Sequence, residues 1–334
     1  MKVTREMVAE RAGVCKQTVS CYLNNTRKIS PKLSARIEQA IAELNYVPDM
    51  IARGLSQKRT MALGVVCSDL TNPNYSEVIE GIEHAAHQKD YSIFVFGAKE
   101  KNHDSMINQL IARRVDGVVV LDFKAHIGDK GFKRLSDNGI KVVLTHSAGE
   151  ISKEYMQLEP DFGMGIRETL LTLKQLGHSD IVMLSCFDTE RHDDKRLQLF
   201  AEYYQEIFGK KAVFLVADEP VATLQTGSSL AKKLLDGGRP VTAVLTTNDL
   251  MAIGAMKELS DRGLTDQISV VGFDNVLYAE YLNPSLSSIG YNKSEYGEKL
   301  FKLFEDSFEG KESRVEFVQT MLFRRSSIRA AAKA

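Results

Sequence analysis

The sequence has few cysteines and no long hydrophobic run. Its cysteines lack CxxC spacing and nearby histidine pairs, which argues against a disulfide framework or a zinc site; they are Cys15, Cys21, Cys67 and Cys186. No apolar stretch approaches the roughly eighteen residues of a membrane span, and the first residues lack the apolar core of a signal peptide. We therefore expect reduced thiols and a protein that stays in the cytoplasm, away from membranes.

The common signatures of catalysis and cofactor binding are missing too. The chain has no GxxxxGK[ST] phosphate loop, no HExxH, no GxSxG and no GxGxxG turn after its first predicted strand. We therefore expect no enzyme activity, no cofactor and no metal. Two rival classes stay open at this point, namely a cytoplasmic α/β enzyme with an appended domain and a ligand-binding protein without DNA activity.

The 334 residues of the chain are too many for one ordinary core and favour two or three domains. Charge is divided unevenly between these parts of the chain. Residues 1–60 carry eleven Lys or Arg against five Asp or Glu, a net charge of +6, which leaves −7 for the remainder because the whole chain carries −1. A basic end favours a polyanionic partner, since its cations release counterions from phosphates. A merely solvated basic surface explains the charge equally well.

Three short helices are predicted in this basic segment. The first runs from Thr4, a suitable N-cap, to Arg11, and it offers Met7, Val8 and Ala12 to a core. After a turn at Gly13, a second helix covers residues 16–23. Its outward side chains are Lys16, Gln17, Ser20 and Cys21. The third has Ser30 as cap and Pro31 at its first position, and its apolar stripe comprises Leu33, Ile37, Ala40, Ile41 and Leu44.

A tight glycine turn followed by an exposed polar helix is typical of a helix-turn-helix, whose second helix enters the major groove. The segment resembles the LacI-type regulators, through VAERAGV at 8–14, QTVS at 17–20, LN at 23–24, ISP at 29–31 and AIAELNYVP at 40–48. The resemblance implies base reading by Lys16, Gln17 and Cys21. It places Thr18 and Ser20 near phosphates, and it adds Thr4, Asn24, Ala52 and Leu55 to the DNA-contacting set.

Side-chain chemistry agrees for two of the base readers. Glutamine pairs with adenine and lysine with guanine, each contributing about 1–3 kcal/mol of discrimination. Cys21 departs from the family, since most similar sequences have arginine there and a thiol cannot make the forked contact with guanine. Cys15 replaces a capping serine, at a cost of about 1 kcal/mol. We therefore expect an operator that differs from the usual one.

Residues 48–59 are predicted to be a hinge. Alone this segment is at best a marginal helix. In similar proteins it becomes helical when two subunits meet over the operator, and the resemblance gives Leu55 the role of a minor-groove wedge that kinks the duplex. The alternative is that Leu55 only packs the linker against its neighbour.

From Met61 onward, short apolar runs alternate with helix-length amphipathic segments, which is typical of parallel α/β sheets. The predicted strands are 62–67, 92–96, 117–121 and 142–145, then 181–185, 213–216, 243–246 and 269–272; the predicted helices include 76–89, 163–176 and 249–262. We expect an all-α helix-turn-helix headpiece (1–47), the hinge (48–59) and a two-lobed α/β effector and dimerisation domain (60–334). Lobe 1 is expected at about 60–160 and 291–320, and lobe 2 at about 161–290 plus the C-terminal end.

The family resemblance continues here, for example in RVDGV at 114–118, NDLMAIGA at 248–255 and VVGFD at 270–274. It implies a fold similar to periplasmic sugar-binding proteins, in which residues 293–308 rejoin the first lobe. By position it assigns effector contacts to Asn74, Tyr75, His146, Arg196, Asn248, Asp274 and Tyr291. These residue types suit a sugar or sugar derivative, with a nucleobase or nucleoside as the second choice.

The resemblance also implies a transcription regulator, by family default a repressor, whose affinity for double-stranded, near-palindromic operator DNA is controlled by a small-molecule effector. The tail at 324–334 has no leucine heptads. We therefore expect a homodimer.

Overall fold

The computed structural model describes residues 3–24, 27–47, 59–98, 103–122, 127–145, 154–187 and 194–332. Residues 48–58 of the predicted hinge lie outside these ranges, and with them Ala52 and Leu55. His146, one of the expected effector contacts, also lies outside. Within the described residues, none of the helices has the length and apolar character needed to cross a membrane.

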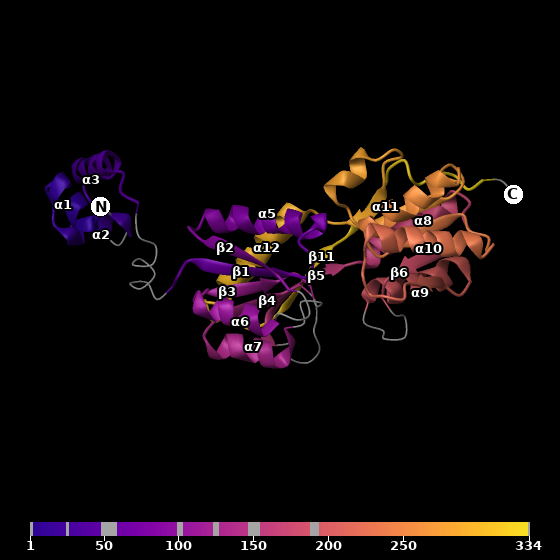
Figure 1. Cartoon of the computed structure of the whole chain (residues 1–334), viewed down its shortest axis with the longest axis horizontal. Helices are drawn as coiled ribbons and strands as arrows, with labels where there is room; N and C mark the ends of the chain where they lie inside the picture. Colours follow the sequence, from indigo (N-terminus) through magenta and orange to yellow (C-terminus); the bar gives the residue numbers. More distant parts are fainter. Residues whose placement is uncertain are drawn as a thin grey trace.

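Three helices form a small bundle at the N-terminal end (Figure 1): α1 (Arg5–Ala12), α2 (Lys16–Leu23) and α3 (Pro31–Leu44). All three predicted helices are confirmed. Thr4 caps α1 as predicted, because its hydroxyl accepts a hydrogen bond from the Met7 amide at 3.3 Å. Ser30 occupies the N-cap position of α3, but its side chain makes no capping bond.

The headpiece core joins all three helices. Val8 from α1, Val19 from α2 and Ile37 from α3 are completely buried. The prediction for Met7 was wrong, since Ala9 rather than Met7 belongs to this core. The remaining predicted stripe of α3 packs against it.

The first lobe is a six-stranded sheet in the order β11-β5-β4-β3-β1-β2. Its elements are β1 (Ala62–Cys67), α5 (Pro73–His87), β2 (Ser92–Gly97), α6 (His103–Ala112), β3 (Gly117–Val120), α7 (Gly128–Asp137), β4 (Lys141–Leu144), β5 (Met156–Asp161), α12 (Lys293–Asp306) and β11 (Val315–Gln319). All neighbouring strands are parallel. One core lies between the sheet and α5 with α12, and the other between the sheet and α6 with α7.

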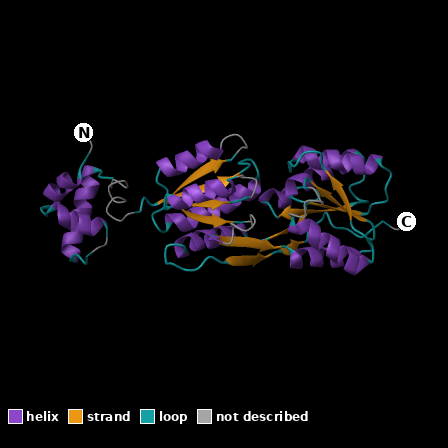
Figure 2. Ribbon diagram, turned by 90° about the horizontal axis from the view of Figure 1, so that it is seen from below, coloured by secondary structure: helices purple, strands orange, loops and turns teal. Residues whose placement is uncertain are grey.

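The second lobe repeats this arrangement with the order β12-β10-β9-β8-β6-β7. It contains α8 (Gly163–Gln175), β6 (Ile181–Ser185), α9 (Lys195–Phe208), β7 (Val213–Val216), α10 (Leu224–Asp236), β8 (Ala243–Thr246), α11 (Asp249–Asp261), β9 (Ser269–Asp274), the short 3-10 helix η3 (Leu277–Tyr281), β10 (Ser287–Gly290) and β12 (Met321–Phe323). Only β12 is antiparallel to its neighbour. Figure 2 shows helices on both sides of the strands in each lobe.

The chain passes between the lobes three times, after β5, after β10 and after β11. The expected return of the chain to the first lobe is confirmed, because α12 packs against α5. The eight predicted strands are present, with ends that differ by at most two residues. Four strands were not predicted, namely β5, β10, β11 and β12. The carboxyl ends of the parallel strands in the first lobe point toward the second (Figure 1).

Candidate DNA interface and interlobe cluster

Helix α2 presents polar side chains at its N-terminal end. Lys16 and Gln17 are exposed, while Ser20 and Cys21 are half-buried at the edge of the helix. The opposite side carries Val19, which is completely buried. The predicted orientation of the helix is therefore confirmed, with its first turn free to approach a duplex.

Lys16 is held in place by α1. Its Nζ donates to Glu6 Oε1 at 2.7 Å, and the two side chains are 60% and 67% exposed. An ion pair this exposed stabilises the fold very little. The Lys16 ammonium can therefore exchange Glu6 for a phosphate or a guanine at small cost.

Cys15 occupies the N-cap of α2 without capping it. No side-chain bond to the helix backbone forms at this position, and the sulfur instead lies 3.1 Å from Thr18 Oγ1. This hydrogen bond lowers the pKa of the exposed Cys15 thiol. All four cysteines are free, and Cys67 and Cys186 are buried.

Arg36 braces the turn between α1 and α2. Its guanidinium nitrogen Nη2 donates to the Ala12 carbonyl at 2.6 Å and lies 3.4 Å from the Gly13 carbonyl oxygen. Gly13 has φ 62°, and a Cβ at this position would stand 2.4 Å from the guanidinium. The turn therefore needs both a glycine and the arginine from α3 that closes it.

A second group of functional side chains gathers where the two lobes face each other. It follows the carboxyl ends of β1, β9 and β10 and the start of α9, the edge where ligands bind in open α/β sheets. We call this group the interlobe cluster; it consists of Asn74, Tyr75, Glu77, Arg196, Asp274, Tyr291 and Lys293.

Side-chain interactions connect the members of the cluster. The Asn74 amide donates to the Tyr291 hydroxyl. Lys293 lies 3.5 Å from Glu77. Burial first, and then the nearby Asp122 carboxylate, raise the pKa of Tyr75, and Asp274 of the opposite lobe adds to this effect. The Asn74 Oδ1 atom is buried and has no hydrogen-bond partner in the described part of the chain.

Arg196 is the central cation of the cluster, with 15% of its side chain exposed. It makes a two-pronged contact with Asp194, from Nε at 2.9 Å and from Nη2 at 2.6 Å, while Nη1 donates to the Thr247 carbonyl at 2.6 Å. Burial opposes its charge, but the Asp194 carboxylate outweighs this effect, so the pKa of Arg196 is raised. The guanidinium also lies 5.3 Å from the ring centre of Phe187 and 5.8 Å from that of Phe273.

Asp274 faces Arg196 from the end of β9. Burial raises the pKa of its carboxyl, although Arg196 and Lys293 act in the opposite direction. Behind it, burial and the Asp274 charge raise the pKa of Asp249 to about 8. Asp249 accepts hydrogen bonds from the Ser288 hydroxyl at 2.6 Å and the Val276 amide at 2.8 Å, so it fixes the backbone that carries Asp274.

Asn248 is placed differently from the other predicted effector residues. Its Oδ1 caps α11 by accepting from the Met251 amide at 2.9 Å, and its Nδ2 donates to the Ala222 carbonyl at 3.2 Å. Both ends of the amide therefore serve the fold of the second lobe.

Neither Glu77 nor Lys293 was among the residues predicted from the sequence to contact the effector. Both are polar residues near the ends of helices, where a solvated position is the ordinary expectation. The signal that could have found Lys293 is its place directly after the crossing segment that contains Tyr291. Glu77 gives no such signal, because its partners lie some two hundred residues away in the sequence.

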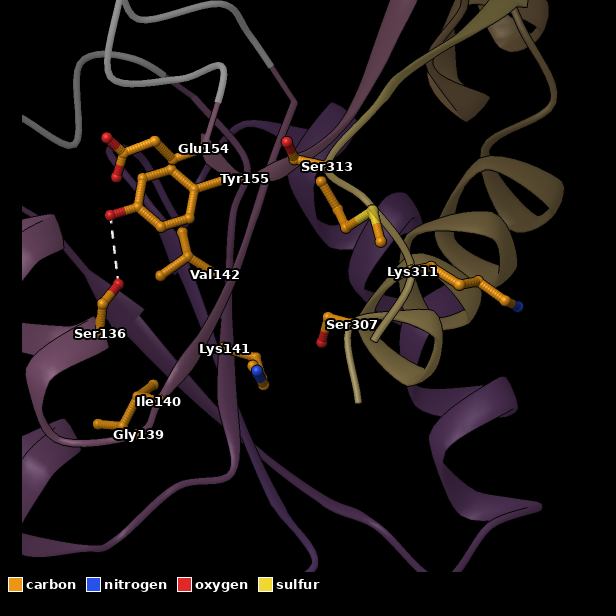
Figure 3. Close-up of a pocket in the computed structure, with 11 residues that line it drawn as sticks. Ser136, Gly139, Ile140, Lys141, Val142, Glu154, Tyr155, Ser307, Lys311 and Ser313 are labelled. Carbon is orange, nitrogen blue, oxygen red and sulfur yellow. Dashed lines mark hydrogen bonds between the residues drawn. The ribbon is translucent and has the colours of Figure 1, made fainter. Parts of the chain in front are cut away.

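A separate hollow of about 250 Å³ lies at the other edge of the first sheet (Figure 3). It is bordered by Lys141 and Met156 at the starts of β4 and β5 and by Ser307 at the end of α12. The 14 residues of α12 separate it from the cluster, which is about 21 Å at the usual helical rise. The hollow therefore does not belong to the interlobe cluster.

Comparison with known proteins identifies both parts of the chain. Residues 6–49 match the family described as bacterial regulatory proteins, lacI family, and residues 63–312 match a periplasmic binding protein domain. The chain belongs to the LacI family. This LacI-family chain is therefore a DNA-binding, ligand-regulated transcription regulator and not an enzyme.

Curated relatives of this LacI-family regulator match nearly its full length. The HTH-type transcriptional repressor PurR of Vibrio vulnificus (strain CMCP6) is 30% identical over 316 residues, which span 91% of this chain and 92% of that protein. Catabolite control protein A of Priestia megaterium is 26% identical over 303 residues, with coverage of 86% and 87%.

Solved structures agree on the architecture. The lac repressor dimer bound to operator and the anti-inducer ONPF has a TM-score of 0.80 at 24% identity, covering 99% of this chain and 100% of that one. The complex of the regulator CelR with cellobiose has a TM-score of 0.70 at 25% identity, covering 97% and 99%. The fold class predicted from the sequence is thereby confirmed.

Proposed function

We propose that this regulator represses transcription as a homodimer, reading a near-palindromic operator with α2 and the hinge and binding a small-molecule effector at the interlobe cluster. The observation that carries the proposal is the exposed first turn of α2 on a basic headpiece, joined in one chain to a buried polar cluster between two lobes. The functional division follows as headpiece 1–47, hinge 48–59 and effector domain 60–334.

The DNA contacts are proposed as the sequence placed them. Lys16, Gln17 and Cys21 read bases, and Thr18 and Ser20 lie near phosphates. The supporting contacts come from Thr4, Asn24, Ala52 and Leu55. Asn24 is braced for this position, because its Nδ2 donates to Ser20 Oγ at 3.4 Å.

The effector is proposed to be a neutral, hydroxyl-rich molecule, with a sugar as first choice. Arg196 is occupied by Asp194, and Lys293 by Glu77 and main-chain carbonyls, so neither cation is free to bind an anion. The Asp274 carboxyl and Asn74 Oδ1 remain as acceptors for ligand hydroxyls. The CelR complex with cellobiose supports a carbohydrate. Aromatic rings around Arg196 keep a nucleobase or nucleoside as the second candidate.

The homodimer is proposed to form through an apolar face that both lobes contribute. Val95 of β2 is exposed, as are Leu277, Tyr278 and Tyr281 of η3. These elements adjoin α5, since α5 packs against β2 and its Glu77 contacts the Leu277 amide. The lac repressor was solved as a dimer on its operator. Tyr281→Arg should therefore shift the protein from dimer to monomer in sedimentation velocity, and an unchanged dimer would exclude this face.

Two experiments test the function itself. Selection from a random duplex pool should enrich a near-palindromic site, and Cys21→Arg should shift the selected consensus toward guanine at one position in each half-site. An unchanged consensus would show that Cys21 does not face a base.

A thermal-shift screen should raise Tm with a neutral sugar but not with its phosphate ester. Stabilisation by the phosphate ester alone would contradict the proposed effector class. Failure of the chain to bind any duplex at low salt would overturn the proposal.

A further inference from the structure

The turn that follows β9 has an unusual backbone. Asp274 and Asn275 have φ angles of 98° and 53°, the left-handed region that residues with a Cβ rarely adopt. The second lobe supplies part of what holds this turn. The Asn275 amide donates to Ser288 Oγ at 2.9 Å, and the Val276 amide donates to Asp249 at 2.8 Å.

Three further main-chain groups of the turn are held by the first lobe. Lys293, the first residue of α12, donates from Nζ to the carbonyl oxygens of Asp274 and Asn275, the latter at 2.8 Å. Glu77 of α5 accepts from the Leu277 amide at 2.9 Å, and its other oxygen lies 3.5 Å from Lys293 Nζ. The Glu77–Lys293 ion pair of the first lobe therefore binds both carbonyl groups and an amide group of a turn in the second lobe.

The buried surroundings of Lys293 make it costly to lose any one of its contacts with the turn. Only 5% of its side chain is exposed, and its ammonium has partners for all three N–H groups in Glu77 and the two carbonyls. A buried ammonium that loses its partners is strongly unfavourable. The contacts of Lys293 and Glu77 should therefore form or break together, as the lobes meet or separate.

The ion pair of Lys195 with Glu159, whose partners come from different lobes, differs in this respect. Lys195 of α9 contacts the buried Glu159 of β5, but its own side chain is 54% exposed. The Lys195 ammonium can turn to water when the lobes separate, so only the Glu159 carboxylate, with 6% of its side chain exposed, resists the loss of this contact. Lys195 is therefore a weaker candidate for controlling how the lobes meet.

We propose that Glu77 and Lys293 are positioning residues that latch the Asp274–Leu277 turn to the first lobe. The latch fixes the strained backbone that aims Asp274 into the interlobe cluster, and it stabilises the closed arrangement of the lobes. An effector that contacts both Asp274 and the first lobe favours the latched state, and this last step rests on the proposed function. The latch itself does not depend on which effector binds.

The test uses full-length, ligand-free protein and hydrogen exchange. Lys293→Met removes the ammonium while keeping a long apolar stem, and Glu77→Ala removes the acceptor of the Leu277 amide. Lys299→Met is the matched control, because it breaks an exposed ion pair with Glu295 on the same helix α12. In both latch variants, peptides that cover residues 274–281 should exchange at least about tenfold faster, while the control stays unchanged.

Unchanged exchange in both latch variants would overturn the proposal, and so would an equal increase in Lys299→Met. Exchange in the headpiece and in β6 reports whether each variant is folded, and Glu77→Ala decides the question if Lys293→Met does not fold. The duplex enriched by the unaltered protein then serves as the DNA probe. The affinity of the protein for this duplex should change at least about fivefold in the latch variants. Equal affinities would show that the latch is not coupled to DNA binding. If no duplex is enriched, the proposed function fails, while the exchange result still decides the latch.

Discussion

Arg36→Ala is expected to unfold the headpiece locally without affecting the effector domain. The guanidinium of Arg36 donates to the Ala12 carbonyl at the end of α1, at 2.6 Å. A hydrogen bond from a charged donor contributes about 1.5–3 kcal/mol, and a cation at a helix C-terminus adds about 0.3–1 kcal/mol. Because Arg36 is exposed, we take the lower end, about 2 kcal/mol. A headpiece of this size is stable by only about 2–7 kcal/mol at the usual stability per residue, so the loss is large.

Hydrogen exchange of the full-length protein measures this effect. Peptides of α1 and α2 should exchange roughly thirtyfold faster in Arg36→Ala, the equivalent of about 2 kcal/mol, while peptides of β1 and β6 keep their rates. Lys32→Ala is the control, because it removes the same charge from α3 at a residue for which the described chain shows no hydrogen bond or ion pair. Specific DNA binding, measured by fluorescence anisotropy, should fall more for Arg36→Ala than for Lys32→Ala. Equal exchange rates in the two variants would refute the proposed stabilisation of the α1–α2 turn by Arg36.

Two further predictions concern ionisable groups. Cys15, exposed and with a lowered pKa, should react with iodoacetamide at pH 8 well before the buried Cys67, whose pKa burial raises to about 12; equal labelling rates in peptide mass spectra would contradict this order. Asp249 should make the folded protein less stable as pH rises from about 4 to about 8, because the unfolded state releases this proton first and the folded state holds it up to about pH 8. Asp249→Asn should therefore flatten the fall in Tm between pH 5 and pH 8, and identical slopes would show that Asp249 is ionised in the folded protein.

Local rules predicted the elements that have strong local signals. The second and third helices were located from Gly13 and Pro31, and four strands, β1, β6, β7 and β8, have the predicted bounds because each is an apolar run between turn residues. The strand β5 was missed for a physical reason. Apolar and polar residues alternate over only four positions, from Met156 to Glu159, before Pro160 interrupts the pattern, and the polar Gln157 and Glu159 are both buried. The buried Glu159 carboxylate is tolerated because it contacts Lys195 of the opposite lobe.

The candidate site also contains residues that the sequence pointed to and residues that only the structure brings together. Asp274, Arg196 and Tyr291 were assigned as effector contacts by their position in the family resemblance, and this assignment stays a prediction. Glu77 and Lys293 were not, because their importance depends on contacts with a turn in the opposite lobe. No periodicity or cap along the sequence reports such a contact. Only the topology, which returns α12 to the first lobe and sets it beside α5, brings the pair together.

The short stretch from Asp274 to Tyr281 connects the parts of the proposed mechanism. Its first residue faces Arg196 in the interlobe cluster, the Leu277 amide is held by Glu77, and Tyr278 and Tyr281 extend from the proposed dimer face. In the proposed mechanism, ligand contact, lobe closure and subunit contact therefore share this segment of eight residues. Under the proposed function, closing the lobes moves the dimer face directly, so the spacing of the two headpieces responds to the effector without a long chain of intermediate side chains. A latch variant that loosens this segment should consequently weaken the dimer as well as its response to effector, which a local defect at Asp274 alone would not do.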